Sequence, residues 1–334
     1  MPNTDTAPHK NHKTPRAMIL SLLLASIFTF VELNCENLFD CRHDASKQDE
    51  EFMPDSYRHW THTRYWRKLN HIGQEILSCG EDTSGWSLPD MVALCEVEND
   101  SVMHDLTKRS LLRKSGYRYI MTSSTDLRGI DVALMYSPAS FSLLNHHSIR
   151  VVPMKDMRPT RDILYASGVV LSGDTLHVFV VHAPSRSGGE VVTRPFRILV
   201  AERLGAAVDS IHSLSPRAKI IVAGDFNDYS NSRSIDYIYK RGLINVSKDA
   251  IGSHGAKGTY RYKGEWGSLD HILMDENLAD SLVECRIHDA PFLLIDDKTY
   301  GGKQPFRTYV GPKYQGGFSD HLPLVARFRM GCRR

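Results

Sequence analysis

The chain has 334 residues, of which 41% are hydrophobic and 24% charged, as is usual for a globular protein. Lysine and arginine together number 41 and aspartate and glutamate 39, so the net charge of +2 gives no overall basic field of the kind that marks nucleic-acid-binding proteins. The 6 cysteines form no Cys-x-x-Cys pair and no zinc-ligand spacing, which argues against a disulfide framework or a zinc site.

The N-terminal residues have the pattern of a leader. Lys10, Lys13 and Arg16 precede an apolar run at 18–25, in the order of the basic and apolar regions of a signal peptide. That run is too short to span a bilayer. The alternative is a hydrophobic lead-in to the first strand. We expect residues 1–26 to be a signal peptide or hydrophobic leader and the protein to be exported (periplasmic or secreted), with a cytoplasmic location as the alternative.

After the leader, many strands are interrupted by a few long amphipathic helices. Helical spacing of apolar residues predicts helices at 64–77, 101–114, 193–211 and 232–241. Apolar or alternating runs predict strands at 27–33, 91–96, 117–122, 131–136, 141–152, 161–171, 175–181, 220–223, 259–262, 268–274, 283–288 and 323–329. Ser101 is the expected N-cap of the second helix, and 41–63 is an expected surface loop. With no repeat and no linker, residues 27–330 are predicted to form a single α/β domain.

One segment at 218–228, with the sequence A-K-I-I-V-A-G-D-F-N-D, delivers polar groups from the end of a buried strand. Gly224 interrupts the apolar run, and Asp225 and Asn227 share a face because they are two residues apart. Taken alone, the segment fits a polar turn as well as a site. Other strand ends carry the same residue types, namely Asn34, Glu36, Glu96, Arg161, His182, Asp270, Asp320 and His321.

The residue types of this set have a chemical meaning. Carboxylates and carboxamides without thiolates suit a hard cation such as Mg²⁺ or Mn²⁺. Histidine beside an acid suits proton transfer or a contact with a phosphoryl oxygen. The sequence contains no G-x-x-x-x-G-K-[ST] motif, which argues against a P-loop enzyme.

The motifs that carry these residues resemble, in their order, those of the endonuclease/exonuclease/phosphatase superfamily, and most closely its exported bacterial members. They are N-x-E-N-L-F-D from Asn34, L-x-E-V-E-N around Glu96, H-A-P-S-R from His182, G-D-F-N from Gly224, L-D-H from Leu269 and S-D-H from Ser319. That superfamily includes deoxyribonuclease I, exonuclease III-type apurinic nucleases, inositol polyphosphate 5-phosphatases and sphingomyelinases. The resemblance covers about 27–330. It implies a deoxyribonuclease I-like, four-layer αββα sandwich of two mixed β-sheets flanked by helices.

The resemblance also implies a metal site. It makes Glu96 the principal carboxylate ligand of Mg²⁺ or Mn²⁺, with Asn34, Glu36 and Asp320 as further ligands. Whether one metal ion or two are bound is left open.

Catalytic roles are implied in the same way. Asp225 resembles the group that orients or deprotonates the attacking water, and Asn227 resembles a hydrogen-bond donor to the phosphate. Asp270 and His321 resemble a paired acid and imidazole at the phosphoryl group, and His182 resembles the family's other histidine.

Phosphate contacts are expected from two arginines. Arg161 resembles the family's basic residue that opens a strand and contacts a phosphate, and Arg186 lies in a glycine-rich loop before a helix that also carries Arg194 and Arg197. The loop fits an anion site and a flexible loop with solvated arginines equally well. The stretch 259–266 interleaves aromatic and basic residues, which fits either base stacking or packing on the core.

These observations together predict a divalent-metal-dependent phosphoesterase. Hydrolysis of a phosphate ester needs an in-line water and positive charge on the phosphoryl oxygens. We expect a nuclease acting on DNA or RNA, monomeric and without a stable protein partner or a membrane span. The alternatives are a phosphatase or phosphodiesterase for inositol phosphates, phospholipid headgroups or nucleotides, and, more remotely, a non-catalytic binding module on the same fold.

Overall fold

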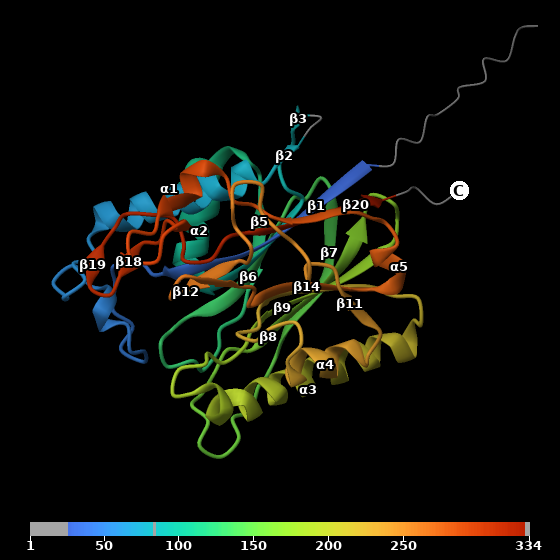
Figure 1. Ribbon diagram of the computed structural model, residues 1–334. Coiled ribbons are helices and arrows are strands. Elements are labelled where there is room, and N and C mark those ends of the chain that lie inside the picture. The colour runs from blue at the N-terminus through green and yellow to red at the C-terminus, as the bar shows by residue number, and fades with distance from the viewer. Residues whose placement is uncertain (1–25, 83–84, 331–334) are drawn as a thin grey trace, which may run out of the picture.

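The computed structural model describes residues 26–82 and 85–330, and its centre is a pair of six-stranded β-sheets packed face to face (Figure 1). The first sheet has the order β15 (Leu282–Ile287), β20 (Leu324–Met330), β1 (Ser26–Leu38), β4 (Met91–Val97), β6 (Asp131–Tyr136), β5 (Arg118–Met121). The second has the order β11 (Leu243–Asn245), β14 (Asp270–Asp275), β10 (Lys219–Asp225), β9 (Thr175–His182), β8 (Ile163–Val170), β7 (Phe141–Ile149). Each sheet combines parallel and antiparallel pairs, so both are mixed.

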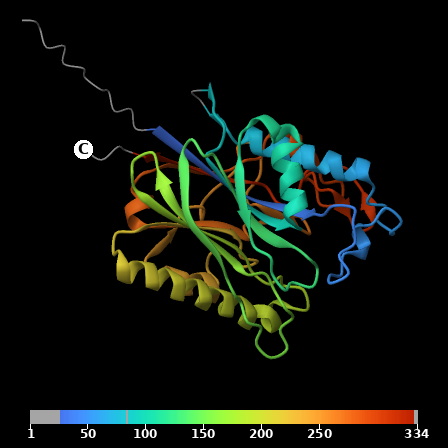
Figure 2. The same cartoon turned by 180° about the vertical axis from the view of Figure 1, so that it is seen from behind.

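Helices cover the outer face of each sheet (Figure 2). Helices α1 (His62–Ser78) and α2 (Asp100–Lys108) pack on the first sheet, and α3 (Glu190–Leu214) and α4 (Arg233–Tyr239) pack on the second. The remaining short elements are α5 (Glu276–Ala279) and the 3₁₀ turns η1 (Glu50–Phe52), η2 (Leu111–Lys114) and η3 (Pro291–Leu293). This arrangement confirms the predicted four-layer αββα sandwich.

Four two-stranded ribbons lie outside the large sheets. They are β2 (Glu81–Asp82) with β3 (Gly85–Trp86), β12 (Tyr260–Tyr262) with β13 (Glu265–Gly267), β16 (Leu294–Asp296) with β17 (Lys303–Pro305), and β18 (Tyr309–Val310) with β19 (Lys313–Tyr314). The β18–β19 ribbon lies beside α1 in both views (Figures 1 and 2).

The alternation of side chains along β1 explains how polar groups come to lie between the sheets. Val31 and Leu33 pack in the core under α1, whereas Phe28 and Phe30 point into the core between the two sheets. Because side chains two residues apart share a face, Asn34 continues the inner row. The inner face of β1 therefore changes from apolar core to polar site along one strand.

Strand register brings the candidate acids and histidine together. In the second sheet Asp225 pairs with His182 on the parallel neighbour β9 and with Asp270 on the antiparallel neighbour β14. In the first sheet Asn34 pairs with Cys95, directly before Glu96. The site is therefore built at one end of both sheets.

Some predicted boundaries are wrong. The first strand extends from Ser26 to Leu38, past the predicted end at residue 33. Asn99, not Ser101, caps α2, because its side chain accepts a hydrogen bond from the Val102 amide. That helix ends at Lys108, and a separate 3₁₀ turn follows it, because Ser110 caps a new turn at Leu112.

The predicted surface loop at 41–63 is also more structured than its sequence indicates. Phe52 and Trp60 are buried, and Phe52 stacks on Phe39 at a centroid distance of 4.1 Å.

Among the described residues no helix has the length and apolarity needed to cross a bilayer. The predicted leader falls almost wholly outside the described residues, so its role and the domain limits remain predictions.

Candidate active site

Gly224 sets the position of the central carboxylate. Its φ is +142°, and a Cβ at this position would lie 1.8 Å from the Val181 carbonyl oxygen. A residue with a side chain cannot make this close approach between β10 and β9. The glycine therefore allows β10 to run against its neighbour up to Asp225.

Asp225 is held by amide groups from three directions. Its Oδ2 accepts hydrogen bonds from Asn34 Nδ2 at 3.1 Å and Asn227 Nδ2 at 3.3 Å, and its Oδ1 accepts one from the Asn227 backbone at 2.8 Å. Burial, followed by the nearby Asp270 carboxylate, raises the pKa of Asp225 to about 7. The carboxylate is therefore fixed in place and more basic than an ordinary aspartate.

Two of the predicted groups, His182 and Glu96, lie beside Asp225. His182 Nε2 is 3.7 Å from Asp225 Oδ2 and 3.9 Å from Glu96 Oε1. Burial, with a contribution from Arg161, lowers the pKa of His182 well below its ordinary value. The imidazole is therefore neutral at pH 7 and can act as a hydrogen-bond donor or acceptor but not as a fixed cation.

Asp270 and His321 form a buried pair although 51 positions separate them in the sequence. His321 Nδ1 lies 2.7 Å from Asp270 Oδ2, the Thr259 hydroxyl donates to the same oxygen at 2.5 Å, and the Tyr260 ring packs on the imidazole at 4.9 Å. Burial lowers the pKa of His321, but the Asp270 carboxylate outweighs it and holds that pKa well above the ordinary value. His321 is therefore a cation in the site.

Strained backbone concentrates at the same place. Of the seven non-glycine residues with positive φ in the described chain, four belong to the motifs of the site: Glu36 (47°), Asn37 (56°), Glu96 (62°) and Asn227 (50°). Non-glycine residues adopt this conformation at a cost, so its clustering is typical of functional sites.

The donor set fits a hard divalent cation. Glu96 Oε2 accepts a hydrogen bond from the Asn37 amide at 2.8 Å, and Asp270 Oδ1 is buried without a hydrogen-bond partner among the described residues. Polar atoms of Asp225, Asp270 and His321 lie within 4.8 Å of one another, and because His321 is cationic only the two carboxylates could bind a metal ion. Three carboxylates around one imidazolium leave negative charge that a divalent ion would neutralise, and their oxygens suit Mg²⁺ or Mn²⁺.

The other predicted metal ligands have different partners. The Asn34 side-chain oxygen accepts from the Glu36 amide at 2.9 Å. Glu36 accepts from the Thr308 amide at 2.6 Å and lies 3.8 Å from Lys68 Nζ. Asp320 accepts from Arg307 Nη2 at 2.7 Å. The structure thus places Glu36 and Asp320 among cationic side chains, and their metal-binding role remains a prediction.

The predicted phosphate contacts also have partners within the protein. Arg161 is buried and donates to Asp126 Oδ2 at 3.1 Å and to the Ala183 carbonyl at 2.8 Å. Arg186 donates to the Asn227 carbonyl at 2.9 Å and lies 4.2 Å over the Tyr229 ring. Arg186 is thus at the rim of the site, while Arg161 supports the loop after His182.

Sequence reasoning missed several residues of the site. Glu32 is buried on the inner face of β1 without a hydrogen-bond partner among the described residues, and burial, then Asp270, raises its pKa well above the ordinary value. Its position two residues before Asn34 in an apolar strand was an available signal. Lys68 and Arg307 reach Glu36 from α1 and from the 306–309 loop, and no local pattern reveals such long-range contacts.

Two mixed sheets packed face to face, with acids, amides and histidines at one end, define the deoxyribonuclease I-like class of fold. The sequence profile of the Endonuclease/Exonuclease/phosphatase family matches residues 29–330, and the chain belongs to that family. No curated protein sequence matches the chain significantly.

Solved structures show the same fold at low sequence identity. A Bacteroides thetaiotaomicron protein of this family has 13% identity and a TM-score of 0.60, with 92% of this chain and 99% of that one covered. A mannosyl-6-phosphatase from the same organism has 14% identity and a TM-score of 0.60, covering 90% and 98%. The human nocturnin catalytic domain has 19% identity and a TM-score of 0.54, covering 90% and 94%.

Proposed function

We propose that the chain hydrolyses phosphate esters with a water molecule that Asp225 orients and deprotonates. The observation that supports this most strongly is the strand register, which sets Asp225 between His182 and Asp270 while two asparagine amides fix its carboxylate. A bound Mg²⁺ or Mn²⁺, held by Glu96, would supply positive charge to the phosphoryl oxygens.

Asp225, His321 and Asn227 have different roles in the proposed hydrolysis. The water oxygen forms the new bond to phosphorus, its proton passes to Asp225, and the ester oxygen leaves with the electrons of the broken bond. His321, kept cationic by Asp270, is placed to contact a phosphoryl oxygen. Asn227 Nδ2 donates its two protons to the Ala183 carbonyl and to Asp225, so this side chain holds the carboxylate in place, and its expected contact with the phosphate would need one of these bonds to be exchanged.

Nucleic acid, as expected from the sequence, is one proposed substrate class. Two arginines support it: Arg186 lies at the rim, and Arg128 donates to the Asn37 side chain next to the site. Both could contact further phosphates of a longer chain, as the binding of nucleic acid requires.

A compact phosphate ester is the second candidate, and the partners of the other arginines favour it. Arg197 is buried against Asp228 at 2.9 Å, and Arg194 pairs with Glu190 at 2.8 Å. Because Arg197 is buried and Arg194 uses both Nε and Nη2 on Glu190, neither side chain extends a phosphate-binding track. The mannosyl-6-phosphatase among the similar folds suggests a sugar phosphate as a test compound.

The experiment is a hydrolysis panel with purified protein in Mg²⁺ or Mn²⁺. It includes plasmid DNA, RNA, bis-p-nitrophenyl phosphate, p-nitrophenyl phosphate, glucose 6-phosphate, an inositol phosphate and sphingomyelin. Hydrolysis of any member that stops with chelator supports a metal-dependent phosphoesterase, and cleavage of plasmid or RNA with a strong salt dependence supports a nuclease. Binding of a compound while no compound is hydrolysed would favour the non-catalytic alternative.

Export and a monomeric state remain proposals. The mass of the native protein tests export, and light scattering tests the monomeric state.

A further inference from the structure

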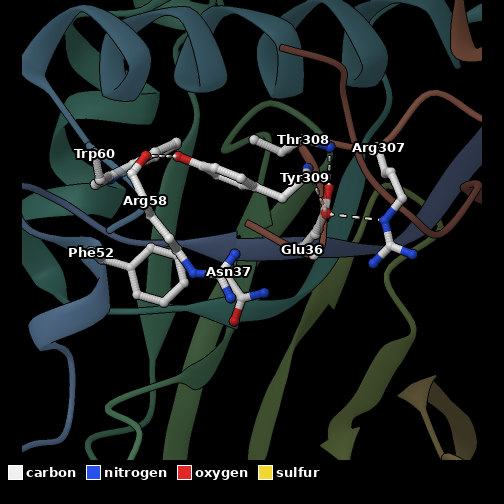
Figure 3. Close-up of a pocket in the computed structure, with 9 residues that line it drawn as sticks. Glu36, Asn37, Phe52, Arg58, Trp60, Arg307, Thr308 and Tyr309 are labelled. Atoms are coloured by element: carbon white, nitrogen blue, oxygen red, sulfur yellow. Dashed lines mark hydrogen bonds and ion pairs between the residues drawn. The ribbon is translucent and has the colours of Figure 1, made fainter. Parts of the chain in front are cut away.

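A polar pocket of about 250 Å³ (Figure 3) opens beside Glu96, the candidate metal ligand. Its walls are the end of β1, the loop at 52–60 and the loop at 307–311. Asn37 connects the pocket with the candidate metal site, because it lines the pocket while its backbone amide donates to Glu96 at 2.8 Å. A ligand in the pocket would therefore lie next to the reacting group without occupying its position.

The pocket presents hydrogen-bond donors that the protein does not use. Arg58 holds Glu51 through Nε at 2.7 Å, and stacking over Phe52 at 5.3 Å and Tyr309 at 5.0 Å fixes its guanidinium. Within the described residues no hydrogen bond occupies its two terminal amino groups. The Asn37 side chain accepts from Arg128 through Oδ1, and its Nδ2 likewise has no acceptor in the described part of the chain.

The one carboxylate in the wall is already neutralised. Glu36 accepts hydrogen bonds from the backbone amides of Thr308 at 2.6 Å and Tyr309 at 3.3 Å. Arg307 Nε lies 3.5 Å from one of its oxygens (Figure 3). Lys68 Nζ lies 3.8 Å from the other. Its acceptors and its charge are thus taken up by the protein, and it offers little repulsion to an anion.

Arg307 adds a second guanidinium to the wall. It donates to Asp320 through Nη2 at 2.7 Å and faces Glu36 through Nε, and no hydrogen bond from another described residue occupies its Nη1. A pocket whose side chains offer donors from two arginines and an amide, and whose carboxylate is already held by the protein, matches an oxyanion.

We infer that this pocket is a second oxyanion subsite, which binds a phosphate group of the substrate other than the one that is hydrolysed. The inference rests on the proposed phosphoesterase function and refines its substrate class. The second phosphate has two possible sources, a compact bisphosphate or the neighbouring phosphate of a nucleic acid strand. Arg58 is the best residue for testing this subsite, because none of its contacts with the described residues involves a side chain at the reacting centre.

Matched substrate pairs test the subsite. One pair is glucose 6-phosphate and glucose 1,6-bisphosphate, and the other is the dinucleotide TpT and its 5′-phosphorylated form pTpT. For the pair that represents the natural class, we expect the additional phosphate to lower KM by about tenfold or more, as one charge-assisted contact allows. Arg58→Gln should reduce that ratio of KM values to about one, and Arg58→Lys should restore part of it.

The control is Arg67→Gln, on the exposed surface of α1, which should keep the wild-type ratio. Thermal unfolding of each variant shows whether it is folded. Equal KM values within both pairs for the wild type would overturn the subsite while leaving the phosphoesterase function intact.

Direct binding separates the two proposals. Calorimetry with methylenebisphosphonate should show binding to the wild type and at least tenfold weaker binding to Arg58→Gln. If no substrate is hydrolysed, the proposed function fails and this titration still decides the pocket. Equal affinity of the wild type and the variant would contradict it.

Discussion

The close approach at Gly224 can be tested with two alanine variants. In Gly224→Ala the new Cβ would meet the Val181 carbonyl oxygen at 1.8 Å, in a backbone conformation with φ +142°. The strain of that conformation costs about 1–3 kcal/mol. The overlap adds about 1–3 kcal/mol, because a backbone oxygen in a sheet cannot rotate away. We expect a total loss of about 4 kcal/mol, a large part of the about 5–15 kcal/mol that stabilises a typical domain.

Gly173→Ala is the matched control, because Gly173 also has a positive φ, +81°, but no atom lies within 4 Å of the place that its Cβ would take. It should lose only about 1–2 kcal/mol. Urea unfolding gives both free energies. Activity of the folded protein should fall about 100-fold in Gly224→Ala alone, because the variant displaces Asp225 by a fraction of an ångström or more. Equal stability and activity of the two variants would refute the role of the close approach.

Three further predictions follow from charged and titrating groups. Burial, then Arg286, lowers the pKa of His288 from 6.5 to about 4. The unfolded chain therefore takes up the proton at a higher pH than the folded protein does. As the pH drops from 6.5 to 4, the free energy of unfolding should fall by about 3 kcal/mol. Urea unfolding at both pH values should show a loss that is about 3 kcal/mol smaller in His288→Asn than in the wild type; equal pH dependence of the two proteins would contradict the role of His288. If Asp270 and His321 act as one unit, each alanine variant and the double variant should have similar residual rates, whereas multiplicative losses would show independent roles. Arg186→Ala should raise KM more than it lowers kcat, and the reverse would place this side chain in the chemistry instead.

Much of the site could be predicted from the sequence because its residues follow strands. A buried strand fixes which side chains share a face. The apolar run before Asp225, and the shared face of Asp225 and Asn227, could therefore be predicted from the local sequence. The ordered motifs then indicated a family whose fold places these strand ends together. The register that pairs Asp225 with His182 and Asp270 agrees with that expectation.

Contacts made by loops and helices were not predictable in this way. Lys68 follows the polar face of a helical pattern, yet it is buried and its Nζ donates to the Thr308 hydroxyl at 2.7 Å, 240 residues away. Arg307 lies in a loop without periodicity. The cap of α2 was misassigned because Asn99 and Ser101 are both good N-cap residues, and only the backbone conformation at Asn99 decides between them.

Metal-dependent hydrolysis by a water that Asp225 activates is the proposed reaction on which the other residue roles depend. It is tested most directly by the rate of phosphate ester hydrolysis for the wild type and Asp225→Asn, after removal of metal with a chelator and again with Mg²⁺ or Mn²⁺ restored. We expect no turnover by the wild type in chelator, recovery with metal, and a rate for Asp225→Asn that stays at least about 100-fold below that of the wild type with metal present. Full activity in excess chelator, or an Asp225→Asn rate equal to that of the wild type, would contradict it.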